Sequence, residues 1–190
     1  MLATYAQDPS RPQLASLRRS SVEALALDKD HQGETVSLAA DVDASAVKTK
    51  VIERVIGETT EGPALETAEI VVSGGRAFDD VEEFDKYLTH GLAEVLGAAV
   101  GATRGAVDAG IKPEQQQIGL TGKIVGPNLY IAVGLSGAIQ HMAGCTGSKN
   151  IVAINIDEYA QIFKFSKFGI VGDYKKILPP LIEKLKEVRQ

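Results

Sequence analysis

The sequence predicts an α/β fold in which a mostly parallel sheet carries helices on both faces. From residue 68 onward, short apolar runs that end in glycine or polar residues alternate with helix-like segments. Such an alternation of strand, turn and helix is typical of parallel strands joined by crossover helices. The chain has 190 residues, 44% of them hydrophobic, which is enough for one domain with a core. We therefore expect a Rossmann-like three-layer sandwich.

The first elements of this alternation lie between residues 68 and 104. Residues 68–75, AEIVVSGG, are a short apolar run that ends in two glycines, as expected of a buried parallel strand. Residues 98–104, AAVGATR, repeat this pattern and predict a second strand. Residues 80–97 lie between the two runs and predict a helix. Its apolar face is made of Val81, Phe84, Leu88, Leu92 and Val95.

The remaining elements follow in the same manner. Three further apolar runs predict strands, at residues 128–137, 150–157 and 169–173. Residues 138–144 predict a short helix after the first of these runs, and a loop with room for another short helix follows the second. Residues 174–188 predict the closing helix, with Pro179 and Pro180 near its start or at a break.

The first part of the chain has a different character. Residues 1–32 are polar, contain two prolines and show little periodicity, which predicts a linker or arm. Residues 34–43 alternate as a strand does, and residues 46–57 fit either a strand or a helix. We therefore expect an arm at residues 1–32 and a folded domain at residues 33–190.

Composition excludes several classes of function. The net charge is −5 and long basic runs are absent, which argues against nucleic acid and anionic membranes as partners. Cys145 is the only cysteine, so a cysteine-rich metal site is excluded and a reducing, cytoplasmic compartment is expected. The sequence has neither a signal peptide pattern nor an apolar run that approaches a membrane span. The three histidines are scattered, so no metal site is predicted.

Known nucleotide signatures are also missing. No GxGxxG follows any predicted strand, and the segment GLTGKIV has too short a glycine spacing for a phosphate-binding P-loop. In a parallel sheet, however, ligands bind where the strands end. The predicted strands end in SGGR, GATR, GLSG, IN and GD. Two arginines, a Ser-Gly turn, an amide and a carboxylate should therefore converge on one edge.

Each of these residues also has a simpler interpretation. Ser136 and Gly137 fit an anion site at a helix start, and they fit a tight turn with a serine cap equally well. Arg76 and Arg104 are suited to phosphate or to an aromatic ring, although most arginines are solvated surface charges. A lone histidine such as His141 is more often a core residue than a catalytic one. From the residues alone, the prediction stops at an anionic, nucleotide-like ligand.

Five segments of the sequence resemble a known family. VVSGGRAF, VGATRGAVDAG, QIGLTGKIVGPNLYIAVGLSGAIQHMAG, IVAIN and GIVGD are similar, in order and in spacing, to the FAD-binding carboxyl-terminal domain of the electron transfer flavoprotein alpha subunit. The resemblance runs from about Ala68 to the end of the chain. It implies that FAD is the cofactor and that the family's preceding α/β domain has no room in 190 residues.

The resemblance also implies where the cofactor lies. Arg76 would contact the dinucleotide, Arg104 would lie over the isoalloxazine ring, and His141 would lie near its pyrimidine edge. Arg104 and His141 would act as electrostatic tuners of the flavin, and Thr121 would approach its N5 atom. Asn155 and Asp173 would serve the adenosine half, flanked by Tyr174. The complete set is Arg76, Thr103, Arg104, Gln117, Ile118, Gly119, Leu120, Thr121, Ser136, Gly137, Ala138, Ile139, Gln140, His141, Asn155, Asp173 and Tyr174.

The implied function is that of an electron carrier without a chemical substrate of its own. Family members pair with a beta subunit and take electrons from dehydrogenases such as acyl-CoA dehydrogenases. They deliver them to a membrane quinone oxidoreductase or another acceptor, in the cytoplasm or, in eukaryotes, in the mitochondrial matrix. Two alternatives remain open: a flavin- or NAD-dependent reductase, and a nucleotide-binding or docking module without redox activity of its own.

Overall fold

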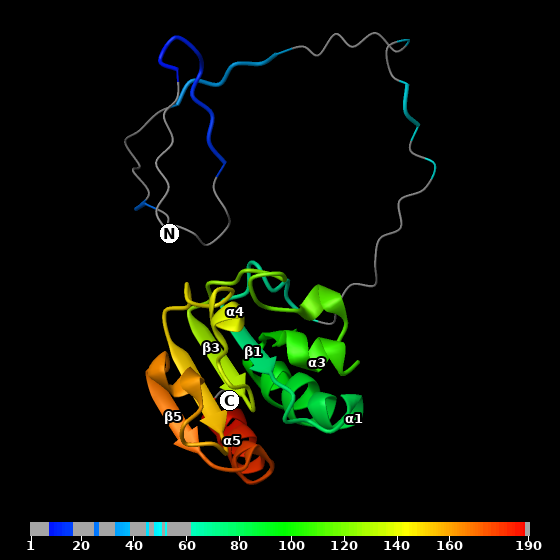
Figure 1. Cartoon of the computed structure of the whole chain (residues 1–190), viewed down its shortest axis with the longest axis vertical. Coiled ribbons are helices and arrows are strands. Elements are labelled where there is room, and N and C mark those ends of the chain that lie inside the picture. Colours follow the sequence, from blue (N-terminus) through cyan, green and yellow to red (C-terminus); the bar gives the residue numbers. More distant parts are fainter. Residues whose placement is uncertain are drawn as a thin grey trace. The chain divides into compact units, whose positions relative to one another are not determined.

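The computed structural model describes residues 8–16, 25–26, 33–38, 45, 48–50, 52 and 62–188 (Figure 1). The chain divides into two units, one that combines residues 1–22 with residues 62–190 and one formed by residues 23–61. The strand predicted at residues 34–43 is not formed in residues 34–38. Its remaining residues, and most of residues 46–57, lie outside the described ones. The predicted boundary between arm and domain stays a prediction.

Among the described residues, five parallel strands form one sheet in the order β2-β1-β3-β4-β5. Their bounds are β1 Ile70–Gly74, β2 Ala99–Ala102, β3 Leu129–Val133, β4 Ile151–Asn155 and β5 Phe168–Val171. Each lies within or overlaps a predicted strand, and Val72 pairs with Val100 on one side and with Ile131 on the other. The expected parallel α/β sheet is therefore confirmed. Strand order reverses between β1 and β3, and ligands of such sheets bind at this reversal.

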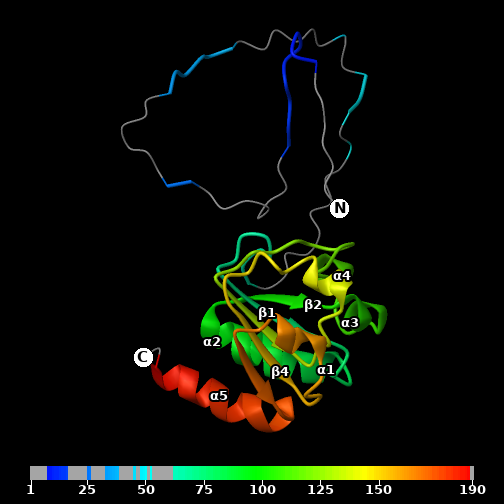
Figure 2. The same ribbon diagram turned by 60° about the vertical axis from the view of Figure 1, so that its left-hand side comes forward.

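Helices and loops cover both faces of the sheet. The helical elements are α1 Val81–Phe84, η2 Asp85–Ala93, α2 Glu94–Leu96, α3 Arg104–Asp108, η3 Glu114–Gln116, α4 Ile139–Met142, η4 Gln161–Lys164 and α5 Tyr174–Val188. On one face, Val72 belongs to a core shared with α1, η2, α2 and α5, and Figure 2 shows the closing helix α5 beside the strands. On the other face, Val71 and Tyr130 pack with Met142 of α4 and Ile162 of η4. The alternation of neighbouring residues between faces is that of a pleated strand.

The helix predicted at residues 80–97 is formed, but its middle is a π-helix. Asp80 caps its start, because its carboxylate accepts the Glu83 N–H at 2.7 Å. Phe84, Leu88 and Leu92 are buried as predicted, whereas Val81 is 45% exposed. Near the end of the helix, Leu96 is buried, whereas the predicted Val95 is only half-buried. A π-helix has more residues per turn than an α-helix, so a spacing of four keeps this face on the sheet.

Two prolines lie inside α5 without ending it. The helix runs unbroken from Tyr174 to Val188 through Pro179 and Pro180, so of the two predicted alternatives, a position near the helix start or at a break, the break is absent. Both prolines are exposed, while Tyr174 and Leu178 are buried. The carbonyl groups that lose their N–H partners therefore lie on the solvent side of the helix, where water can bind them. The buried side of α5 keeps its packing against the sheet.

Candidate functional site

A cavity of about 540 Å³ lies where β1, β2 and β3 end. The chain segments that follow these three strands form its walls, together with the loop before β3. Every residue proposed from the sequence between Arg76 and His141 lines it, except Ile139. These are Arg76, Thr103, Arg104, Gln117, Ile118, Gly119, Leu120, Thr121, Ser136, Gly137, Ala138, Gln140 and His141.

Four further residues line the cavity that the sequence analysis did not select. They are Gly75, Gly105, Gly134 and Leu135. Three of them are glycines next to predicted strand ends, and this position is the sequence feature by which they could have been predicted. A side chain at Gly75 would lie 2.3 Å from the Gly134 carbonyl oxygen, so the β1 and β3 turns approach each other without room for one. Glycine at position 75 therefore lets the two turns that border the cavity lie this close together.

A second cavity of about 270 Å³ lies where β4 and β5 end. Asn155, Asp173 and Tyr174 line it, and Gly134 lines both cavities, so the two adjoin. Ile139 lies in neither; it is 76% exposed and lines a surface depression that shares Ser136, Ala138 and Gln140 with the larger cavity. Apart from Ile139, the proposed residues are thus divided between two adjoining cavities along the edge of the sheet.

The charge of the larger cavity is positive. Arg76 and Arg104 both line it, and none of its lining residues in the described chain is a carboxylate. Arg104 lies at the start of α3 and forms an exposed ion pair with Asp108, 3.4 Å away and one helical turn further on. Exposed pairs of this kind are weak, so the guanidinium keeps much of its ability to attract an anion. This charge favours a ligand that carries phosphate.

Hydrogen bonds hold the loop at residues 117–123 against the cavity. The Ile118 N–H donates to the Ala102 carbonyl at the end of β2 (2.9 Å), and the Leu120 N–H donates to the Gln140 carbonyl (2.8 Å). The side-chain amide of Gln117 donates to the Thr121 hydroxyl oxygen at 3.0 Å. The Thr121 hydroxyl thereby retains its own proton for donation. The loop is anchored at both ends, so Thr121 faces the cavity from a fixed position.

Two hydroxyl groups have roles that differ from the simplest sequence interpretation. Thr103 caps α3, because its hydroxyl oxygen accepts the Ala106 N–H at 3.3 Å. Ser136 caps no helix: α4 begins at Ile139, and its capping residue Ala138 supplies no side-chain bond. The chain from Ser136 to Ala138 is not helical, so Ser136 does not belong to the helix that carries Gln140. Both residues nevertheless line the cavity.

Polar residues at the smaller cavity are partly used within the protein. The Asn155 amide donates to the Leu135 carbonyl and its oxygen accepts the Asp157 N–H, both at 2.9 Å. One oxygen of Asp173 accepts the Lys175 N–H at 2.9 Å, at the start of α5. These bonds fix the orientation of both side chains. Asn155 therefore holds together the turns that follow β3 and β4.

His141 is buried and both of its ring nitrogens are bonded inside the protein. The Nδ1 atom lies 3.1 Å from the Ile118 carbonyl oxygen, and Nε2 lies 2.9 Å from the Tyr130 hydroxyl. A carbonyl only accepts, so Nδ1 carries the proton and Nε2 accepts from Tyr130. Burial lowers the pKa of His141 to about 4, against a smaller opposite effect of the Ile118 carbonyl. His141 is therefore neutral at neutral pH.

Two features are absent from the described part of the chain. No group of three or more His, Cys, Asp or Glu side chains there could hold a metal ion. Within the same residues, none of the helices combines the length and the apolar character that crossing a bilayer requires.

Fold and site together define a class of protein. An all-parallel sheet, a strand-end site at the reversal of strand order and two arginines at that site are features of a nucleotide-binding α/β domain. Two adjoining cavities of unequal size suit a ligand with two parts. The donor set of guanidinium, hydroxyl and amide groups fits a dinucleotide bridged by phosphates.

Comparison with known proteins identifies the family. Residues 64–146 match the electron transfer flavoprotein FAD-binding domain. The chain is 42% identical over 189 residues to the electron transfer flavoprotein subunit alpha of Thermoanaerobacterium thermosaccharolyticum, covering 100% of this chain and 56% of that protein. It is 47% identical over 174 residues to the Bacillus subtilis subunit alpha, covering 92% and 52%. A probable mitochondrial subunit alpha of Saccharomyces cerevisiae is 56% identical over 126 residues, covering 66% and 36%.

The chain therefore belongs to the electron transfer flavoprotein alpha-subunit family, and its residues 64–146 match the family's FAD-binding domain. The cofactor of that domain family is FAD. All residues that line the larger cavity fall within the matched residues 64–146, whereas Asn155, Asp173 and Tyr174 lie beyond them. The chain spans about half the length of the curated relatives it matches.

Proposed function

We propose that this chain binds FAD along the two cavities and forms the flavin-carrying part of an electron transfer flavoprotein alpha subunit. The observation that carries the proposal is the cationic cavity at the ends of β1, β2 and β3, whose lining lies entirely within the family match. The larger cavity would hold the isoalloxazine ring and the phosphates, and the smaller one the adenosine. When bound, FAD supplies the redox chemistry by taking up and releasing electrons.

The residues of the larger cavity would bind and orient the cofactor. Arg76 and Arg104 offer guanidinium groups to the phosphates and to the face of the ring. Thr121 presents a hydroxyl proton from its anchored loop. His141 presents a neutral ring that is fixed by Tyr130 and Ile118. A positive charge near the ring favours its reduced, more negative forms, and Arg104 is the residue that would supply it.

We further propose that the chain acts as an electron carrier and is not an enzyme with a substrate. The support is the family match and the relatives' name, electron transfer flavoprotein subunit alpha. A beta subunit, dehydrogenases as electron donors and a quinone oxidoreductase as acceptor are the partners that this assignment implies. We propose a cytoplasmic location, or the mitochondrial matrix in a eukaryote, since the yeast relative is named as mitochondrial.

Replacing Arg104 with alanine is expected to lower the reduction potential of bound FAD. Loss of one nearby positive charge worth about 1.4 kcal/mol lowers a one-electron potential by about 60 mV. Controlled-potential titration of the FAD-loaded chain, followed by visible absorption, measures the shift. Arg104→Lys keeps the charge and should retain most of the wild-type potential.

The matched control is Lys184→Ala, which removes an exposed cation paired with a carboxylate in the same helix, distant in sequence from the cavity. It should leave the potential unchanged. If the reduction potential of FAD in Arg104→Ala equals that in the wild type, Arg104 does not tune the flavin. Steady consumption of NADH by the FAD-loaded chain alone would contradict the carrier assignment and favour a reductase.

A further inference from the structure

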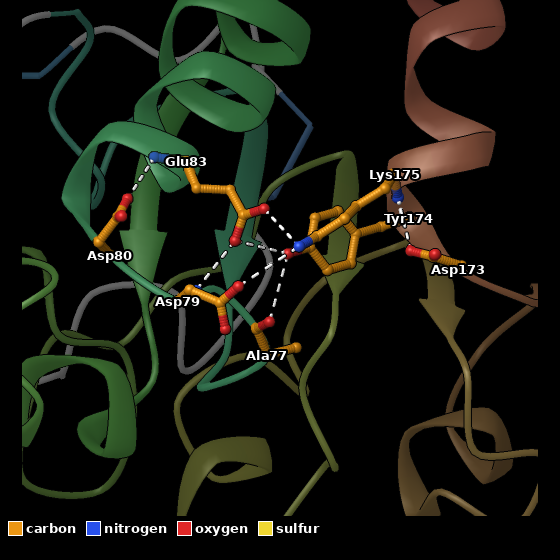
Figure 3. Close-up of polar contacts among 7 residues, drawn as sticks. All are labelled: Ala77, Asp79, Asp80, Glu83, Asp173, Tyr174 and Lys175. Atoms are coloured by element: carbon orange, nitrogen blue, oxygen red, sulfur yellow. Dashed lines mark hydrogen bonds and ion pairs between the residues drawn. The ribbon is translucent and has the colours of Figure 1, made fainter.

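One carboxylate outside both cavities accepts bonds from three separate groups. Glu83 lies in α1, and its Oε2 accepts the Asp79 N–H and the Tyr174 hydroxyl, both at 2.9 Å (Figure 3). Its Oε1 lies 2.7 Å from the Lys175 ammonium nitrogen. The Glu83 side chain is only 17% exposed. It therefore connects the loop after β1 with the start of α5, two segments that are far apart in the sequence.

The surroundings favour the ionised form of this carboxylate. The pKa of Glu83 is lowered, first by the Asp79 N–H and then by the bond to Lys175. Lys175 has a second, more exposed partner in Asp79 at 3.4 Å. The ammonium group is thus flanked by two carboxylates. Its charge is largely neutralised at the place where it meets the smaller cavity.

The two side chains that Glu83 holds are walls of the smaller cavity. Tyr174 and Lys175 line it together with Asn155 and Asp173, whereas Glu83 does not. The Tyr174 ring also packs against Phe78, with ring centroids 4.5 Å apart, so its hydroxyl is held at one end and its ring at the other. Glu83 therefore acts on the cavity only through its partners. A wall with an aromatic ring, an amide and a neutralised lysine suits an uncharged nucleoside better than a phosphate.

We propose that Glu83 is the positioning residue for the adenosine end of the bound dinucleotide, a role that rests on the proposed function. It orders Tyr174 and Lys175 before the ligand arrives and removes the free charge that would otherwise draw a phosphate into the smaller cavity. The phosphates are then left to Arg76 and Arg104 in the larger cavity. The direction in which FAD lies along the sheet edge follows from this division of charge.

The test compares three probes on the full chain: FAD, FMN, which lacks the adenosine, and ADP, which lacks the flavin. Dissociation constants for the wild type and Glu83→Gln are measured by isothermal titration calorimetry. We expect Glu83→Gln to raise the dissociation constants of FAD and ADP about tenfold. This is the size expected when binding of the ligand must itself order two side chains. The FMN constant should stay within about twofold, because FMN does not reach the smaller cavity.

Two further variants make the test decisive. Glu187→Gln removes a carboxylate from an exposed ion pair near the end of α5 and should leave all three constants unchanged. Tyr174→Phe removes the hydroxyl that Glu83 accepts while keeping the packed ring, and should weaken FAD and ADP as Glu83→Gln does. If urea unfolding shows that Glu83→Gln does not fold, the Tyr174→Phe variant alone still tests the proposal.

Each pattern of results has a separate meaning. The role of Glu83 would be overturned if Glu83→Gln weakened the binding of FAD and FMN equally. It would also be overturned if the dissociation constants of FAD and ADP did not change. Tighter ADP binding by Glu83→Gln would also overturn it, since a freed lysine would then be a phosphate ligand. A wild-type chain that binds ADP but neither flavin would overturn the proposed function and leave the subsite standing. A wild-type chain that binds none of the three probes would overturn both.

Discussion

Gly137→Ala is expected to destabilise the domain by about 3 kcal/mol, the sum of a left-handed backbone cost and an overpacking cost. Gly137 has a φ of +78°, a conformation that alanine rarely adopts. A methyl group there would lie 2.4 Å from the Ile162 backbone nitrogen and 2.6 Å from its Cα atom. The Ile162 N–H donates to the Ser136 carbonyl at 3.0 Å, so η4 cannot move away freely.

The matched control for this substitution is Gly97→Ala. Gly97 ends α2 with a φ of +64°, but no heavy atom lies within 4 Å of where its methyl group would be. It should therefore cost only about 1 kcal/mol, the backbone part alone. Urea unfolding of both variants and the wild type measures the difference. Equal destabilisation by the two substitutions would mean that contact between the β3 turn and η4 is not tight.

The stability of the domain is expected to fall as the pH decreases from about 6.5 to about 4, by about 3 kcal/mol in total from His141. The pKa of His141 is lowered from 6.5 to about 4 by burial. Between these values the unfolded chain binds a proton that the folded chain does not, so acidification favours unfolding. Below about pH 4 this residue contributes no further loss.

Urea unfolding at pH 7, 5 and 4 tests this expectation. His141→Gln should unfold with a shallower pH dependence than the wild type, because the buried imidazole is gone. His90→Gln, which replaces an exposed histidine of η2, should behave as the wild type does. A nuclear magnetic resonance titration in which His141 protonates near pH 6.5 would show that its ring is not held between Tyr130 and Ile118.

The sequence predicted most of the sheet and the composition of the larger cavity. The strand runs were readable because buried parallel strands are short, apolar and end in glycine, as at Gly74 and Gly134. The convergence of Arg76, Arg104 and Ser136 followed from the rule that parallel strands end at one edge. Identification of FAD as the ligand came from the family resemblance and not from these residues.

Other features depend on contacts that no local pattern contains. A 3.6-residue period allows burial of either Val95 or Leu96, and the π-helix that favours Leu96 is not encoded in the local pattern. The continuation of α5 through Pro179 depends on packing of its other side. The neutral state of His141 follows from its burial, and the orientation of its ring depends on Tyr130 and Ile118, which reach it from other elements. Glu83 was missed because it acts across 91 positions on Tyr174.

The central claim is that this domain holds FAD at the edge of its parallel sheet. The most direct measurement is the visible absorption spectrum of the purified chain after incubation with FAD and gel filtration. We predict oxidised-flavin bands that remain with the protein at about one FAD per chain, the stoichiometry expected of a single strand-edge site. A colourless chain, with all FAD recovered in the small-molecule fractions, would contradict the claim.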